Sequence, residues 1–263
     1  MDNYIETNKK LWNDKVGFHL ASDFYDQPSF LAGRNSLQPI ERQYLNDIAG
    51  KKILHLQCHF GQDTISLSRM GACATGVDFS ENAIDAARSA VAQLGTDTQF
   101  VCCDIYDLPN RLDGQFDIVF TSYGTIGWLP DLNRWAEVIA NFLKPGGQLV
   151  FVEFHPVVWM FDYDFEKIGY SYFNEESIIE TTEGTYADKS APIRNQSVNW
   201  NHPTGEVLNA LIQNGMRLEQ FDEFDYSPYN CFNGTVEESP GQFRIAKLGN
   251  KIPMVFALTA TKI

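Results

Sequence analysis

Short apolar runs alternate with helical segments through the first 156 residues, and this alternation limits the chain to few folds. The runs KKILHLQ, ATGVDFS, TQFVCCD, FDIVFTSY and QLVFVEF have the length and composition of buried strands. Helical patterns separate them, such as the one after Ser80, where Ala83, Ile84 and Ala87 recur at helical spacing. Strands joined by helices form right-handed crossovers, so the pattern predicts a parallel sheet with helices on both faces.

The composition is that of an acidic globular protein. The net charge is −14 and 44% of the residues are hydrophobic. Because negative charge repels polyanions, we expect no nucleic-acid partner and no anionic membrane surface. No apolar run reaches the length of a membrane span, and the first residues (MDNYIETNKKLW) do not resemble a signal peptide, so we expect a cytoplasmic protein. The 5 cysteines show no C-x-x-C spacing, which indicates free thiols rather than disulfides or a zinc site.

Polar residues follow the ends of the predicted strands. Ligands of parallel sheets bind outside the carboxyl ends of the strands. This rule predicts one ligand-binding rim, made of Gln57 to Gly61, Asp78, Asp104, Ser122 with Tyr123, and Glu153 to His155.

The residues at this rim resemble a known family. The series HLQCHFGQDT, GVDFS, CCDIYDLP, FDIVFTSYGTIGWL and LKPGGQLVFVEFHP is similar, in order and spacing, to the class I S-adenosylmethionine-dependent methyltransferases. The resemblance implies a Rossmann-like α/β fold, with a mostly parallel seven-stranded sheet, an antiparallel last strand and helices on both faces. A helix over 203–214 and strands at 218–226 and 253–261 resemble the family's ending. The resemblance also implies S-adenosylmethionine as cofactor and methyl transfer to a small-molecule acceptor.

We expect a single methyltransferase domain over 1–263, in four parts. Residues 1–50 form an N-terminal helical cap, 51–156 the cofactor-binding core, 157–201 an insertion, and 202–263 the C-terminal completion of the sheet. A long connection rich in aromatic residues predicts a lid over the reactive methyl group and a closed acceptor pocket. The aromatic residues of the insertion are Trp159, Phe161, Tyr163, Tyr170, Tyr172, Phe173, Tyr186 and Trp200.

Two acidic residues end predicted strands where the nucleoside of the cofactor would lie. Asp78 is placed to accept both ribose hydroxyls, as an acidic residue about 20 positions beyond the glycine turn does in dinucleotide sites. Phe79 is expected to pack beside the adenine. Asp104 is placed to accept a hydrogen bond from the adenine amine, while Ile105 borders the base.

The loop after the first strand departs from the family's pattern of an acidic residue and three alternate glycines. His55, Gln57 and His59 replace the acid and the first two glycines, and Gly61 remains. We expect Gly61 to allow close approach, the backbone of Gln57 and Cys58 to meet the methionine tail, and the Gln57 or His59 side chain to add hydrogen bonds. Two alternatives stay open: the histidines only fill the turn, or the loop is blocked and the fold is not catalytic.

Methyl transfer from a sulfonium is an in-line displacement, in which positioning and exclusion of water supply most of the acceleration. Ser122 and Tyr123 lie where the methionine tail and the reactive methyl are expected. No base is obligatory, but for a hydroxyl, thiol or protonated amine His155 is the first candidate base, with Tyr123 and His202 behind it. Glu153 with His155 and His202 is too sparse a set to predict a metal site.

Two other functions stay open. The first is an S-adenosylmethionine-binding protein without transfer activity. The second is a nicotinamide-dependent Rossmann oxidoreductase, against which the loop argues, because Gln57 and His59 crowd the place of a pyrophosphate. A nucleic-acid amino-methyltransferase is disfavoured, since SYGT stands where such enzymes resemble one another in an Asn/Asp-Pro-Pro-aromatic motif. The sequence does not identify the acceptor, the methylated atom or the oligomeric state.

Overall fold

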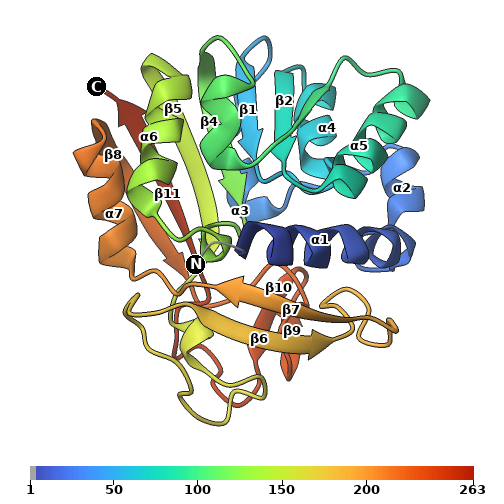
Figure 1. The fold of residues 1–263 in the computed structure, drawn as a ribbon, viewed down its shortest axis with the longest axis vertical. Helices are drawn as coiled ribbons and strands as arrows, with labels where there is room; N and C mark the ends of the chain where they lie inside the picture. Colours follow the sequence, from blue (N-terminus) through green and yellow to red (C-terminus); the bar gives the residue numbers. More distant parts are fainter. Residues whose placement is uncertain (1–3) are drawn as a thin grey trace.

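A seven-stranded sheet forms the centre of the protein (Figure 1). The structure, a computed structural model, describes residues 4–263, so the first three residues of the expected N-terminal cap lie outside it. The strands of this sheet are β1 (Lys52–Leu56), β2 (Cys73–Asp78), β3 (Gln99–Cys102), β4 (Phe116–Ser122), β5 (Leu143–Phe154), β8 (Met216–Phe224) and β11 (Val255–Lys262). Their order is β3-β2-β1-β4-β5-β11-β8, and β11 runs antiparallel to both of its neighbours. The predicted fold class is confirmed.

Helices cover both faces of the sheet, because its strands carry apolar side chains on both faces. On one face Phe151 and Phe256 pack with Trp135 in a core that also takes in the last helix. On the other face Ile53 and Phe120 pack against the segment before β1 and the helix after it. The helices are α1 (Tyr4–Ala21), α2 (Gln27–Leu31), α3 (Pro39–Arg42), α4 (Gln62–Arg69), α5 (Glu81–Leu94), α6 (Leu132–Phe142) and α7 (Thr204–Gln213). No helix within 4–263 is long and apolar enough to cross a membrane.

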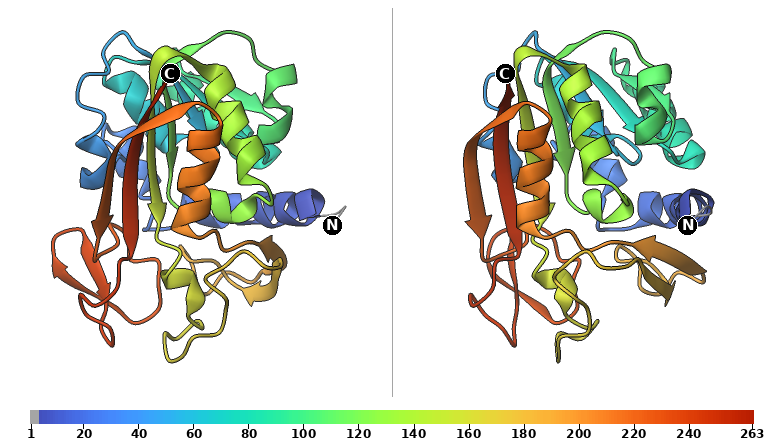
Figure 2. Two further views of the ribbon diagram at one scale, coloured as in Figure 1. Left: turned by 90° about the vertical axis from the view of Figure 1, so that its left-hand side faces the viewer. Right: turned by 60° about the vertical axis from the view of Figure 1, so that its left-hand side comes forward.

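A second layer lies beyond the carboxyl ends of the parallel strands. It holds two antiparallel hairpins, β6 (Ile178–Glu183) with β7 (Arg194–Asn199) and β9 (Thr235–Ser239) with β10 (Gln242–Ile245). In both views of Figure 2 the hairpins lie beyond the same edge of the sheet as α1. The first hairpin belongs to the predicted insertion. The second lies between β8 and β11, where we had expected only completion of the sheet.

Helix α1 lies crosswise between the sheet and the hairpins (Figure 1). Three part-buried hydrogen bonds hold it there. The Asn8 amide donates to the Val198 carbonyl at 2.8 Å and accepts from the Val198 N–H at 2.9 Å, which fixes α1 against β7. Asn13 accepts from the Ser80 hydroxyl at 2.6 Å, at the start of α5. The helix therefore covers the ligand-binding rim predicted from the sequence.

Candidate cofactor and acceptor site

One cavity of about 800 Å³ lies at the carboxyl ends of the strands, under α1. Its wall comes from the strand ends, α1, the insertion and the second hairpin. Tyr123 and His202 line it, whereas His155 does not. All the residues predicted to bind the cofactor line this cavity: Gln57, Cys58, His59, Gly61, Asp78, Phe79, Asp104, Ile105 and Ser122.

The two strand-end carboxylates are held by backbone groups. Asp78 is 8% exposed and accepts from the backbone N–H groups of His59 at 2.8 Å and Ser80 at 2.9 Å. Burial raises the pKa of Asp78 to about 6, and these hydrogen bonds oppose the rise. Asp104 accepts from the Tyr106 N–H at 2.7 Å, and burial raises its pKa. A carboxylate has about four acceptor positions, so both side chains retain acceptor capacity for a ligand in the cavity.

The glycine-poor loop adopts the backbone conformation that glycine would favour. Gln57 has a φ of 53° and His59 a φ of 51°, both in the left-handed region. The Gln57 amide donates to the Thr125 carbonyl at 2.8 Å, and its oxygen is buried without a partner among the described residues. His55 belongs to β1 and also lines the cavity. Its Nδ1 lies 2.8 Å from the Thr64 hydroxyl, and burial lowers its pKa to about 3, so the imidazole is neutral.

The His59 side chain connects the loop to α1. Its Nε2 lies 2.9 Å from Nδ1 of His19, and its ring meets the Trp12 ring edge-on with centroids 5.2 Å apart. Burial lowers the pKa of His59, and the nearby His19 and Lys15 lower it further, so the imidazole is neutral. The side chain therefore holds α1 over the cavity as well as filling the turn.

Backbone N–H groups of the loop are largely used within the protein. That of Cys58 donates to the Val77 carbonyl at 2.9 Å and that of His59 to the Asp78 carboxylate at 2.8 Å. The Gly61 N–H donates to the Cys58 carbonyl at 3.0 Å. The Cys58 N–H therefore has a partner within the protein, and contact of the Gln57 and Cys58 backbone with the methionine tail stays a prediction.

Gly61 is required by packing. Its φ is 77°, and a Cβ at this position would lie 2.4 Å from the Phe100 ring and 3.1 Å from Ala87. The absence of a side chain thus lets the start of α4 pack closely against β3 and α5. Glycine has the same packing role at the third position of dinucleotide-binding loops.

The histidines proposed as bases have other partners. His155 Nε2 lies 3.0 Å from a carboxylate oxygen of Glu223 on β8, and its side chain is 6% exposed. The structure does not bring it to the cavity. His202 Nε2 lies 2.8 Å from the Leu129 carbonyl and its Nδ1 3.1 Å from Glu206, so both ring nitrogens are engaged. Neither histidine offers a free nitrogen to a ligand in the cavity.

Two acidic residues that sequence reasoning missed, Glu41 and Asp63, lie near Tyr123. The φ of Tyr123 is 45°, unusual for an aromatic residue, and its hydroxyl donates to Glu41 at 2.7 Å. Burial raises the pKa of Glu41 to about 8. Asp63, in the first turn of α4, lines the same cavity; burial raises its pKa, and a hydrogen bond from Ser36 opposes the rise. Asp63 could have been predicted as a cavity residue from its position in the sequence, two residues after Gly61.

Glu153 shapes the loop that follows β4. Its carboxylate accepts from the N–H groups of Thr125 at 2.7 Å, Ile126 at 3.2 Å and Phe154 at 2.7 Å. It also accepts from the Gly124 N–H and from the Thr125 hydroxyl. Burial raises its pKa, and these bonds oppose the rise. Glu153 is thus fully occupied in fixing the loop after Tyr123.

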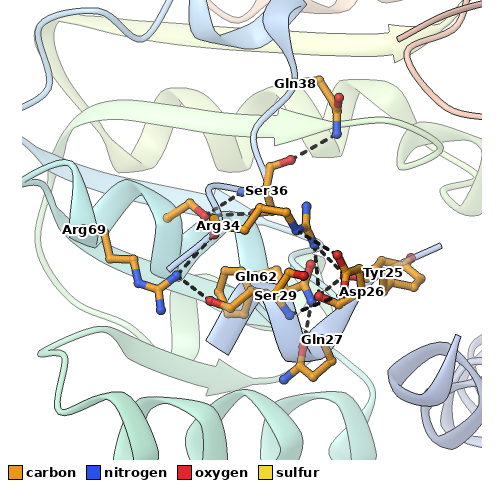
Figure 3. Close-up of polar contacts among 11 residues, drawn as sticks. Tyr25, Asp26, Gln27, Ser29, Arg34, Ser36, Gln38, Gln62 and Arg69 are labelled. Carbon is orange, nitrogen blue, oxygen red and sulfur yellow. Dashed lines mark hydrogen bonds and ion pairs between the residues drawn. The ribbon is translucent and has the colours of Figure 1, made fainter. Parts of the chain in front are cut away.

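A polar network fastens the segment before β1 to α4 (Figure 3). Gln62 donates to the Tyr25 carbonyl at 3.1 Å, and Arg69 to the Phe30 carbonyl at 2.9 Å. The Arg34 guanidinium donates to the same Tyr25 carbonyl at 2.6 Å and lies at the centre of Figure 3. The network sets Tyr25 and Arg34 in the cavity wall.

Aromatic residues form the wall opposite the sheet. Tyr172 and Phe173 of the insertion do not line the cavity. The second hairpin region, which the sequence did not mark, adds Tyr229, Cys231 and Phe232. The insertion contributes Trp159, Phe161, Tyr163, Tyr170, Tyr186 and Trp200.

Comparison with known proteins agrees with this geometry. Residues 53–147 match the family described as a methyltransferase domain. The chain is 32% identical over 135 residues to the ubiquinone biosynthesis O-methyltransferase of Coxiella burnetii, covering 50% of this chain and 57% of that protein. The matched region is therefore little more than half the length of such curated relatives.

Solved structures with the same fold extend over more of the chain. An S-adenosylmethionine-dependent methyltransferase from Mesorhizobium loti has a TM-score of 0.59 at 22% identity, covering 88% of this chain and 100% of that one. The cyclase SpnF has a TM-score of 0.55 at 17% identity, covering 85% of this chain and 78% of that one. These similarities show a shared fold. Residues 53–147 therefore resemble a methyltransferase domain, and the chain shares its fold with these solved structures.

Proposed function

We propose that this protein transfers the methyl group of S-adenosylmethionine to a small, partly apolar acceptor enclosed in the cavity. The observation that carries the proposal is the single cavity of about 800 Å³, which joins the strand-end carboxylates to an aromatic wall. Pockets of this size suit small molecules. A polymer would need an open groove instead.

The polar groups of the cavity fit the cofactor. Asp78 has acceptor positions for ribose hydroxyls, and Asp104 for the adenine amine. Phe79 and Ile105 would offer apolar surface to the base, and Ser122 and Gln57 would hold the tail. The buried Gln57 oxygen without a partner matches an ammonium donor such as the one in that tail. When bound, S-adenosylmethionine supplies a methyl group on a sulfonium sulfur, and this sulfur leaves as a neutral thioether once the methyl group is transferred.

Asp63, in the first turn of α4, and Tyr123, after β4, are suited to a hydroxyl acceptor. The Asp63 carboxylate can accept the acceptor's proton, the role first assigned to His155. Tyr123 is proposed to position the acceptor, because its side chain is held by Glu41 at 2.7 Å. The relatives' name, O-methyltransferase, supports oxygen as the methylated atom.

A labelled-methyl screen tests the proposal. The protein is incubated with S-adenosylmethionine carrying a labelled methyl group and a metabolite extract, and the labelled product is identified by mass spectrometry. We expect label in one compound of low molecular mass that carries a hydroxyl. Binding of S-adenosylhomocysteine without any transfer would instead indicate a binding protein, and preference for NADH an oxidoreductase.

The variant Asp63→Asn separates chemistry from binding. It should lower the transfer rate by a factor of about 100 or more, as expected for loss of a general base, while S-adenosylhomocysteine binds normally. Asp85→Asn on the exposed surface of α5 is the matched control and should leave both unchanged. A fully active Asp63→Asn enzyme would rule out this base.

A further inference from the structure

Lys15 is a buried lysine in the cavity wall with no polar partner. Its residue is 8% exposed, and no hydrogen bond or ion pair reaches its ammonium from within 4–263. The nearby lysines of the same helix differ, since Lys9 pairs with Glu81 and Lys10 with Asp14. Charged side chains are rarely buried without a partner, so this ammonium needs an explanation.

The surroundings of Lys15 are aromatic and carry no neutralising charge. Its ammonium lies 4.9 Å from the centroid of the Trp12 ring and 5.7 Å from that of Tyr186. Burial lowers the pKa of Lys15 to about 8, with no acidic group opposing the fall. The neighbouring His19 and His59 are neutral because burial lowers their pKa as well. The site therefore has one cation and space beside it for an anion.

The course of α1 locates this ammonium along the cavity. Near its middle, Asn13 contacts Ser80, two residues after Asp78. At its far end, His19 contacts the loop at His59. Lys15 lies between these two contacts, and so between the position of the ribose and the loop after β1.

Three N–H groups of this loop are already used within the protein. The N–H groups of Cys58, His59 and Gly61 already bond within the protein, as described above. The methionine tail of the cofactor carries a carboxylate that needs hydrogen-bond donors or a cation. We propose that Lys15 binds this carboxylate and replaces the loop N–H groups as its recognition element; the inference rests on the proposed function.

Two ligands distinguish binding of the amino-acid tail from binding of the nucleoside. S-adenosylhomocysteine has the amino-acid tail, whereas 5′-methylthioadenosine has the same nucleoside and thioether without it. Binding of both is measured by calorimetry for the wild type, Lys15→Met, Lys15→Arg and the matched control Lys10→Met. We expect Lys15→Met to weaken S-adenosylhomocysteine at least about tenfold and to leave 5′-methylthioadenosine within about twofold. Lys15→Arg should retain most of the affinity, and Lys10→Met should change neither ligand.

The melting temperature of each ligand-free variant checks folding. Because Lys15→Met removes an unpaired buried charge, we expect an unchanged or higher melting temperature. Equal affinity of wild type and Lys15→Met for S-adenosylhomocysteine would overturn the inference. Equal weakening of both ligands would overturn it too, since that indicates lost packing. A wild-type protein that binds neither ligand would instead refute the proposed function together with this inference.

Discussion

Replacing Glu153 with glutamine should destabilise the protein although the side chain keeps its shape. The carboxylate oxygens accept only from N–H and O–H donors around the loop after β4. A glutamine keeps one oxygen and turns the other into an NH₂ group. Either orientation leaves two backbone N–H groups facing a donor: those of Gly124 and Phe154, or those of Thr125 and Ile126.

The magnitude follows from these contacts. Each buried donor that loses its acceptor costs about 1–3 kcal/mol, and two of them cost about 2–6 kcal/mol. Removing the buried charge of Glu153 offsets part of this cost. We expect the free energy of unfolding to fall by about 2–4 kcal/mol and the melting temperature by roughly 5–15 °C.

Calorimetric melting of the ligand-free protein measures the effect. Glu137→Gln, at an exposed position of α6, is the control and should melt like the wild type. S-adenosylhomocysteine should also bind Glu153→Gln more weakly, because the loop carries Tyr123 and the Thr125 carbonyl that holds Gln57. A Glu153→Gln protein that melts within about 1 °C of the wild type would refute the reasoning.

Two further predictions concern the cofactor side. Burial raises the pKa of Asp78 to about 6, so its carboxylate becomes protonated as the pH falls through 6 and loses acceptor capacity for the ribose. The wild type should therefore bind S-adenosylhomocysteine more weakly at pH 5 than at pH 8. At pH 8, Asp78→Ala should bind it about 10- to 100-fold more weakly than the wild type does, and the affinity of this variant should depend little on pH. Calorimetry at both pH values checks this, and a pH-independent wild type would contradict it. His59→Gly should loosen α1, because the contact between His59 and His19 is lost. The variant should show faster hydrogen exchange in residues 4–21 and weaker cofactor binding. Exchange equal to that of the wild type would indicate that His59 only fills the turn.

The sheet and its rim were predictable because both depend on local pattern and a general topological rule. Apolar runs between helical segments marked the strands, and parallel strands bring their carboxyl ends to one edge. The positions of Asp78 and Asp104 at the cavity were therefore predictable from the sequence alone. His155, the residue after β5, did not: its N–H donates to the Met254 carbonyl at 2.9 Å, and its side chain turns to Glu223 on β8.

The rest of the cavity wall depends on long-range packing that no local pattern reveals. Asn8 and Val198 are 190 residues apart, yet their paired hydrogen bonds set α1 over the rim. Glu41 likewise meets Tyr123 across 82 residues. A buried lysine within a helix looks the same in the sequence as a solvated one, so Lys15 could be distinguished only after α1 was placed.

The loop after β1 and helix α1 are best understood as one unit. A non-glycine residue in the left-handed region costs of order 1 kcal/mol or more, and the loop carries two such residues, Gln57 and His59. Their side-chain contacts offset this cost: Gln57 with the Thr125 carbonyl, and His59 with His19 on α1. A loop of glycines would lack these contacts and would leave His19 of α1 without its contact to His59. The replacement of glycines in the loop is therefore coupled to the presence of an ordered helix above it, and that helix brings the ammonium of Lys15 to the same end of the cavity.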